Sequence, residues 1–172
     1  MINSQKEGDI LVSLTGSSGT LLPGKVFIAL DEKTGPGISL TLSQEDAKVT
    51  FKSDAIGSVT GDQLFDFAFS GLAENEAVMK QAAGSDASSF TFAFAHNGSL
   101  PGYAQFSIRT NLASGMKVNV YKYDAGAKQF SMIASGVQVA ENGIVTYLNN
   151  ATSEYLITNA TLEGASLTDA YT

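Results

Sequence analysis

Apolar side chains recur at every second position along most of this chain, and this pattern restricts its fold more than any other feature. Two phenylalanine stripes show it most clearly: Phe65, Phe67 and Phe69, and Phe90, Phe92 and Phe94. Successive side chains of a β-strand point to opposite faces, so alternation of this kind predicts half-buried strands. Roughly ten such segments with turns between them predict an all-β protein with one short helix, an antiparallel β-sandwich of the Ig-like or jelly-roll-like kind.

The alternating segments extend along the whole chain. We expect strands over residues 10–14, 25–30, 38–42, 48–52, 63–70, 89–95 and 105–110. Clusters of Gly, Pro, Asn and Ser, such as residues 97–102, mark the loops between them. A barrel would need closure, of which the sequence carries no specific trace, so we favour the sandwich.

The C-terminal part is predicted to form a β-meander between Met116 and Thr158. A hairpin turns at Asp124-Ala-Gly-Ala, where glycine adopts positive φ at little cost. Two short strands at 137–140 and 144–148 are joined through Asn142-Gly143, a dipeptide that favours two-residue hairpin turns. A last strand, residues 155–158, closes the meander.

Two segments carry helical signals. Residues 71–83 are rich in Ala, Glu, Met and Lys and predict the one helix. Ser43-Gln-Glu-Asp-Ala has a Ser cap followed by acidic residues, which predicts a single helical turn.

The expected domain organisation is simple. Residues 1–9 form a disordered lead-in, residues 10–160 a single β-sandwich module, and residues 161–172 a tail or linker to a following module. The segment 10–42 has too little apolar mass to fold alone, so we expect it to complete the same sandwich.

Composition excludes several classes of function. The chain has 172 residues and a net charge of −7. It contains no cysteine, which rules out disulfides and thiolate metal sites. An acidic surface repels phosphate backbones and anionic lipids, so we expect no nucleic-acid binding. No apolar run approaches the roughly 20 residues that a membrane span needs, so we expect no membrane insertion. We expect a monomer without cofactor or metal.

Catalytic parts are missing from the sequence. His96 is the single histidine, so zinc sites and Ser-His-Asp chemistry lack their usual components, and a turn or surface role is expected for it. Acidic pairs such as Glu74 and Glu76 fall on the short helix or in turns, not on strands lining a cleft. We therefore expect no enzyme.

Tyrosines are the candidate ligand-binding residues, because sugars stack on exposed aromatic rings and the chain has no tryptophan. Tyr121 and Tyr123 lie opposite Val118 and Val120 on one strand. If the valines enter the core, the tyrosines face solvent about 7 Å apart and form a stacking platform. The candidate site residues are Tyr121, Tyr123, Lys117, Asn119 and Tyr103. The alternative is that Tyr121 and Tyr123 lie under a neighbouring loop or tile the sheet face.

Four sequence stretches occur in an order that is typical of one kind of module. They are Phe65-Asp-Phe-Ala-Phe with the helical segment after it, Phe92-Ala-Phe-Ala-His-Asn-Gly-Ser-Leu-Pro-Gly-Tyr, Val118-Asn-Val-Tyr-Lys-Tyr-Asp, and Glu141-Asn-Gly-Ile-Val-Thr-Tyr with Ser153-Glu-Tyr-Leu-Ile-Thr. From about residue 49 to 158 the chain resembles a non-catalytic β-sandwich repeat module of multimodular cell-surface and scaffold proteins of Gram-positive, polysaccharide-degrading anaerobes. It departs from that pattern at Ala125-Gly-Ala, where Thr-Gly-Lys is commoner.

The resemblance implies a non-catalytic, extracellular module that is attached to the cell surface through other parts of a longer protein. We expect it to bind polysaccharide of the plant-fibre or starch type. The alternative is a structural spacer, or an adhesion or protein-interaction module, which contacts neighbouring modules and takes no small ligand.

Overall fold

The computed structural model describes residues 8–13, 21–31, 38–57, 59–71, 73–162 and 165. Most of these residues are in β-strands, with two short helices, which confirms the all-β, sandwich-like prediction. The strands are β1 Gly8–Ser13, β2 Leu21–Pro23, β3 Ile38–Ser43, β4 Ala47–Ile56, β5 Leu64–Asp66, β6 Phe69–Ser70, β7 Ser89–Arg109, β8 Lys117–Asp124, β9 Gln129–Gln138 and β10 Ile144–Thr158. The helices are α1 Gly24–Asp31 and α2 Glu76–Ala83, and a 3-10 turn spans Glu141–Gly143.

One large sheet carries the fold. Its strand order is β1-β3-β4-β7-β10-β8-β9, with β6 also paired to β7, and β2 and β5 form a separate small sheet. All pairs of the large sheet are antiparallel except β1 with β3, so the sheet is mixed and not purely antiparallel as predicted.

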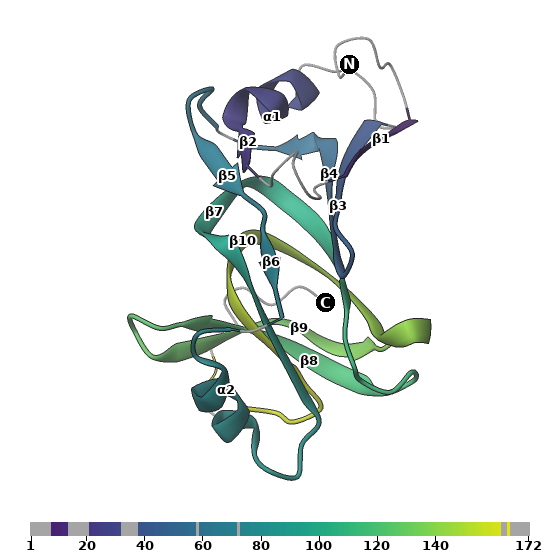
Figure 1. Ribbon diagram of the computed structural model, residues 1–172, viewed down its shortest axis with the longest axis vertical. Helices are drawn as coiled ribbons and strands as arrows, with labels where there is room; N and C mark the ends of the chain where they lie inside the picture. The colour runs from purple at the N-terminus through teal and green to yellow at the C-terminus, as the bar shows by residue number, and fades with distance from the viewer. Residues whose placement is uncertain are drawn as a thin grey trace.

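The two longest strands, β7 and β10, pair over most of their length and join two ends of the molecule (Figure 1). One end, named here the β4 end, consists of β1, β3 and β4 with residues 98–109 of β7 and 144–152 of β10. The other, the β8 end, consists of β6, β8 and β9 with residues 89–97 and 153–158. Between them the β7–β10 register shifts twice, between Asn149 and Ala151 and between Thr152 and Glu154, because each time β7 advances five residues where β10 advances two. Irregularities of this kind bend a strand and increase its twist, so one sheet forms both parts of the sandwich-like fold.

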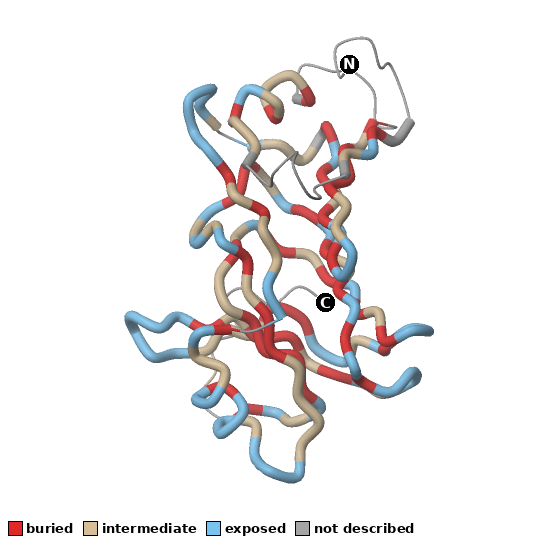
Figure 2. The backbone as a smooth tube through the Cα atoms, viewed as in Figure 1, coloured by how far each residue is buried: buried red, intermediate tan, exposed pale blue. Residues whose placement is uncertain are grey.

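Aromatic rings fill the core between the two ends. Phe106 stacks on Tyr147 at a centroid distance of 5.1 Å within the β4 end, and Phe92 stacks on Tyr155 at 5.0 Å within the β8 end. Contacts across the bend complete the cluster, because Tyr147 and Tyr155 lie 5.7 Å apart. Figure 2 shows the buried segments following strands of both ends. Such ring pairs add to the free energy gained from burial itself.

The segment 25–30, predicted as a strand, is helix α1, so that prediction was wrong. Alternation of Val26, Ile28 and Leu30 suggested a strand, but Phe27 and Leu30 are also three residues apart, which suits one face of a helix. Both are fully buried, and the Phe27 ring lies 4.9 Å from that of Phe51 on β4. The segment fits both a strand period of two residues and a helical spacing of three, and packing against β4 favours the helix. Phe27, Leu30, Ile38, Leu40 and Leu42 belong to the same core as the later strands.

The predicted helical turn at Ser43–Ala47 is also wrong. Ser43 ends β3, and Gln44 N donates to Ala47 O in a tight turn that leads directly into β4. The Gln44 side chain bonds Phe67 O at 2.6 Å and accepts from Phe69 N at 3.1 Å. It therefore holds the short chain between β5 and β6, which splits the predicted single strand 63–70 in two.

The β-meander is corrected in its order. β8 and β9 form the predicted hairpin, but Lys128 (φ 56°) takes the positive φ in its turn and Gly126 does not. Asn142 and Gly143 have the expected positive φ values of 65° and 79°. The strand after them does not pair with β9. It lies between β7 and β8, because its apolar face packs with the β7 phenylalanines.

Two further boundaries differ from prediction. Helix α2 begins at Glu76 and ends at Ala83, inside the predicted 71–83 segment. The predicted loop 97–102 is part of strand β7, in which Gly98 (φ 132°) supplies the local irregularity. Leu162, expected in a tail, is buried against the domain. Residues 1–7 and 166–172, predicted as lead-in and tail, lie outside the described part of the chain.

Removing the hydroxyl group from two neighbouring core tyrosines, Tyr147 and Tyr155, should change stability in opposite directions. The Tyr155 hydroxyl donates to Ala151 O, whereas the buried Tyr147 hydroxyl has no hydrogen-bond partner among the described residues. Tyr155→Phe removes this hydrogen bond and should lower the free energy of unfolding by about 1 kcal/mol. Tyr147→Phe removes an unpaired buried hydroxyl and should leave it unchanged or raise it by up to about 1 kcal/mol. Urea denaturation of both variants measures the difference, and equal losses would contradict it.

The stability of the Tyr147→Phe variant should also differ from that of the wild type at alkaline pH. Burial raises the pKa of the Tyr147 phenol well above its ordinary value of 10, because the phenolate is poorly solvated there. In the unfolded chain this phenol ionises near pH 10, so stability is complete below that pH and falls as the pH rises above it. Tyr147→Phe should flatten this decline, as followed by urea midpoints between pH 8 and pH 11. An unchanged slope would show that other groups cause the decline.

Candidate functional site

The predicted tyrosine platform is wrong, because neither ring faces solvent. Tyr121 is 0% exposed and Tyr123 is 4% exposed. The alternation itself was correct, since Val118 and Val120 enter the main core and the two tyrosines lie on the opposite face. What the sequence pattern left open is whether anything covers that face.

A second apolar cluster covers the tyrosines. Met79 of α2, Ala73 before that helix and Leu162 after β10 pack with them. Phe130 of β9 lies 4.8 Å from the Tyr123 ring. The Tyr121 hydroxyl accepts a hydrogen bond from Leu162 N at 3.0 Å, so its polar end is also used within the protein. The structure therefore agrees with the alternative stated for these residues, in which a neighbouring segment of the same protein covers them.

The other three predicted site residues separate in space. Asn119 is bound on both sides, because its Nδ2 donates to Ala160 O at 3.0 Å and its Oδ1 accepts from Gly136 N at 3.1 Å. Lys117 is exposed at the start of β8. Tyr103, on β7 at the β4 end, is 46% exposed and is the one predicted aromatic that faces solvent. The structure therefore does not bring the five predicted residues together.

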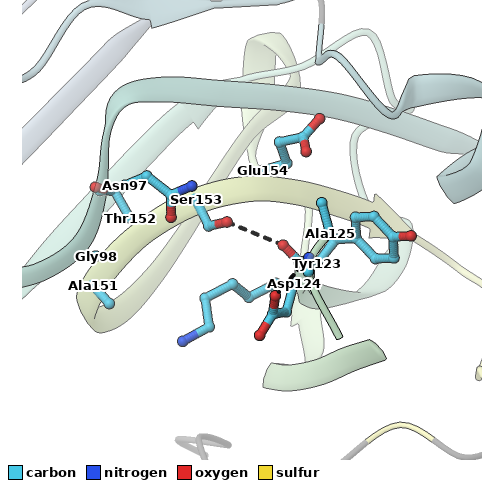
Figure 3. A pocket seen from close by; sticks show the side chains of 11 residues that line it. Asn97, Gly98, Tyr123, Asp124, Ala125, Ala151, Thr152, Ser153 and Glu154 are labelled. Carbon is cyan, nitrogen blue, oxygen red and sulfur yellow. Dashed lines mark hydrogen bonds between the residues drawn. The ribbon is translucent and has the colours of Figure 1, made fainter. Parts of the chain in front are cut away.

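One groove lies beside the bend of β10 (Figure 3). It has a volume of about 240 Å³ and is lined by Asn97, Lys122, Asp124, Ser153 and Glu154, among others. Its polar character suits hydrogen bonding to a sugar. Its lining, however, is mostly engaged in holding the bend.

Internal hydrogen bonds use most of the groove's polar atoms. Asp124 Oδ1 accepts from Gly126 N and Ala127 N, and Ser153 Oγ donates to Tyr123 O at 3.0 Å. Both oxygens of Glu154 accept from Asn75, one from its backbone N at 2.6 Å and the other from its Nδ2. The hydrogen bonds in the groove therefore connect β8, β10 and the segment before α2, and these donors and acceptors are not available to a ligand.

The larger polar surface is the solvent-facing side of the β4 end, named here the outer face. It is composed of the outward side chains of four neighbouring strands. They are Ser39, Thr41 and Ser43 of β3, Lys48, Thr50 and Lys52 of β4, Tyr103, Gln105, Ser107 and Arg109 of β7, and Thr146 and Leu148 of β10. Of these Thr41 is buried, at 7% exposed, and Leu148 is apolar. The residues between these outward side chains in sequence, such as Val49, Phe51 and Phe106, are fully buried. The outer face is thus the polar half of the same alternation that forms the core.

Register aligns the side chains of the outer face in rows. Thr50 lies opposite Thr41 on one side and Gln105 on the other, and Lys48 lies opposite Ser43 and Ser107. Hydroxyl groups pair within the rows, as Thr41 Oγ1 with Thr50 Oγ1 at 2.9 Å. Phe51 lies opposite Ala104, and the β4–β7 register shifts directly beyond this pair, where Lys52 and Tyr103 are the next residues on their own strands. Amine, amide, hydroxyl and aromatic groups are therefore next to one another on a firm sheet.

The single histidine is held by contacts within the fold. His96 lies on β7, where its Nε2 contacts Ser99 O at 2.8 Å and its ring lies 5.1 Å from that of Phe65. No group of three or more His, Asp or Glu side chains gathers as metal ligands within the described ranges. Neither described helix is long and apolar enough to cross a membrane.

Comparison with protein-family models, with curated proteins and with solved structures found no match. The family resemblance drawn from the sequence motifs stays a prediction.

The outer face was not identified from the sequence, although a signal for it was present. Lys48-Val-Thr-Phe-Lys52 and Gln105-Phe-Ser-Ile-Arg109 alternate strictly between polar and apolar residues. That pattern gives which residues face outward on each strand. It does not say that β4 and β7 are neighbours, which is what gathers the polar residues into one surface.

Glu154 should matter for stability through its contact with Asn75. Glu154→Ala removes the acceptor of two hydrogen bonds and leaves Asn75 N unpaired, so we expect a loss of about 1–3 kcal/mol in the free energy of unfolding. Glu74→Ala is the matched control, because it removes the same charge from an exposed position and should change stability by less than about 0.5 kcal/mol. Thermal denaturation of both variants tests this. Equal effects would mean that the contact contributes nothing beyond its charge.

Proposed function

We propose that this protein is a non-catalytic carbohydrate-binding module of a secreted, multimodular cell-surface protein, and that it binds polysaccharide across the outer face. One observation carries the proposal: the polar sheet face at the β4 end includes an aromatic residue, Tyr103, that is 46% exposed, whereas the tyrosines at the β8 end are covered. The order of sequence motifs that resembles modules of polysaccharide-degrading systems supports the same conclusion.

The chemistry of the outer face suits a sugar chain. A pyranose ring presents apolar C–H groups that stack on an aromatic face, and hydroxyl groups that need hydrogen-bond partners around it. Tyr103 offers the aromatic surface, and Gln105, Thr50 and Lys52 lie on the same strand or the adjacent one. Thr50 and Gln105 are register partners across β4 and β7, and Lys52 pairs with Ser39 of β3, so these side chains need little further ordering when a ligand binds. Tyr103 lies at the point where the registers of β7 with β4 and with β10 both shift.

The outer face is preferred to the groove beside the bend of β10. Asp124, Ser153 and Glu154 in that groove already hold backbone atoms, and a sugar would have to replace bonds that maintain the fold. On the outer face Lys48 and Lys52 extend into solvent, so their ammonium groups can meet a ligand without such a loss.

The second candidate function is a spacer, or an adhesion or protein-interaction module. Its supporting observation is that the strands β1 and β9 at the ends of the large sheet, and the short β6, are each paired on one side only within the described part of the chain. Open edges accept a further strand from another protein or module.

The proposal predicts that Tyr103→Ala abolishes polysaccharide binding. Affinity electrophoresis in gels that contain soluble starch, xylan, mannan, β-glucan or polygalacturonate should show retardation of the wild type by at least one glycan. Loss of one stacking ring should weaken binding by about 1–3 kcal/mol, enough to restore free migration.

Leu64→Ala is the control, because it truncates another large exposed side chain on β5, away from the outer face. Its retardation should equal that of the wild type, and the melting temperatures of all three proteins should agree. Wild-type migration unaffected by every glycan would reject carbohydrate binding and favour the spacer or adhesion function.

A further inference from the structure

We propose that the ligand of the outer face is an anionic polysaccharide whose sugar units bear carboxylates, and that Lys48 and Lys52 are the residues that select it. This inference rests on the proposed function, since it names the ligand class of the same surface. It depends on where the cations of this acidic protein lie.

The outer face is locally cationic although the chain carries a net charge of −7. Lys48, Lys52 and Arg109 all project from it, and all three are exposed. Arg109 N donates to Asp46 O, so Arg109 continues the row of β4 two residues beyond Lys48. With a rise of about 3.3 Å per residue, the two lysines are about 13 Å apart and the three cations span about 20 Å. A row of this length fits several successive units of a chain better than a single small anion.

The two lysines are the available charges in this row. Arg109 Nη1 lies 3.8 Å from Asp46 Oδ1, an exposed and long ion pair that offsets part of its charge. Lys48 and Lys52 make no ion pair with any acidic side chain that the structure describes. The neighbours of Lys48 across the strands are Ser43 and Ser107, and that of Lys52 on β3 is Ser39, so the cross-strand neighbours of both ammonium groups carry neutral hydroxyls. Along the chain Lys48 has Asp46 two residues before it, and this is the carboxylate that lies near Arg109.

Because salt screens distant charges, the charges on the outer face, and not the net charge of the protein, determine whether an anionic ligand is attracted there. At physiological ionic strength, charges more than about 8 Å apart in solvent hardly interact, so the acidic groups at the β8 end contribute little at the outer face. A carboxylate that approaches Lys48 or Lys52 gains a charge-assisted hydrogen bond that a neutral sugar cannot form. The hydroxyl, amide and aromatic groups between the lysines then contact the uncharged parts of the same chain.

The test compares two forms of one polymer. Polygalacturonate and highly methyl-esterified pectin share a backbone and differ in whether the carboxyl groups are charged. We expect the wild type to bind polygalacturonate at least tenfold more tightly than the esterified form, and binding should weaken as sodium chloride is raised from 0.05 to 0.5 M. Affinity electrophoresis or titration calorimetry gives both ratios.

Lys48→Gln/Lys52→Gln should weaken polygalacturonate binding roughly tenfold, with an unchanged melting temperature, and leave binding of the esterified form as it was. Lys117→Gln/Lys128→Gln is the matched control, because it removes the same charge from exposed positions on the β8–β9 hairpin. Its affinity for polygalacturonate should equal that of the wild type.

The outcomes separate this inference from the function on which it rests. Equal binding of both pectins, or of a neutral glycan alone, that is lost in Tyr103→Ala but kept in Lys48→Gln/Lys52→Gln would overturn the carboxylate inference and retain carbohydrate binding. Equal losses in the two lysine double variants would overturn it too, since net charge alone would then explain the effect. Equally tight binding of single-stranded oligothymidylate would show a general polyanion surface and overturn it as well. Failure to bind any glycan would overturn both proposals.

Discussion

The pairing of β7 with β10 is the constraint on which the rest of the structure depends. These two strands continue from one end of the molecule to the other, and every further strand of the large sheet is added to one side of this ribbon or the other. Backbone hydrogen bonds have to be satisfied along the whole ribbon, so a bend is possible only where the register is irregular, between Asn149 and Glu154. The aromatic rings packed across this bend hold the two ends together.

The two outer surfaces of this sheet have opposite environments. At the β8 end the outward residues include the apolar cluster of Tyr121, Tyr123 and Leu156, and α2 and Leu162 pack over it. At the β4 end the outward residues are polar, and the most extended of them remain in solvent. A polar surface held on firmly paired strands meets the usual requirement of a recognition site, which is a fixed arrangement of side chains. This difference, and no single motif, is what distinguishes a candidate binding surface in this protein.

Polar side chains that are engaged inside the protein contribute to the fold and not to binding. Asn119 was predicted as a ligand-binding residue, yet its amide holds Ala160 and Gly136, and Glu154 in the groove likewise holds Asn75. An interaction that the fold requires is a poor place for a reversible ligand, because the ligand has to compete with it. Lys48 and Lys52 have no such duty in the described structure.

The sequence by itself determined the fold class, which side chains of most strands point inward or outward, and the Asn142-Gly143 turn. These are local properties, because they follow from a period of two residues and from a dipeptide that tolerates positive φ. Tertiary structure decided that 24–31 is a helix, where Phe27 fits against Phe51, and that β10 lies between β7 and β8. It also decided which outward face is covered. Cover depends on segments distant in the chain, and alternation along one strand holds no information about them. The candidate site could therefore be predicted as a set of outward side chains, but not as a surface.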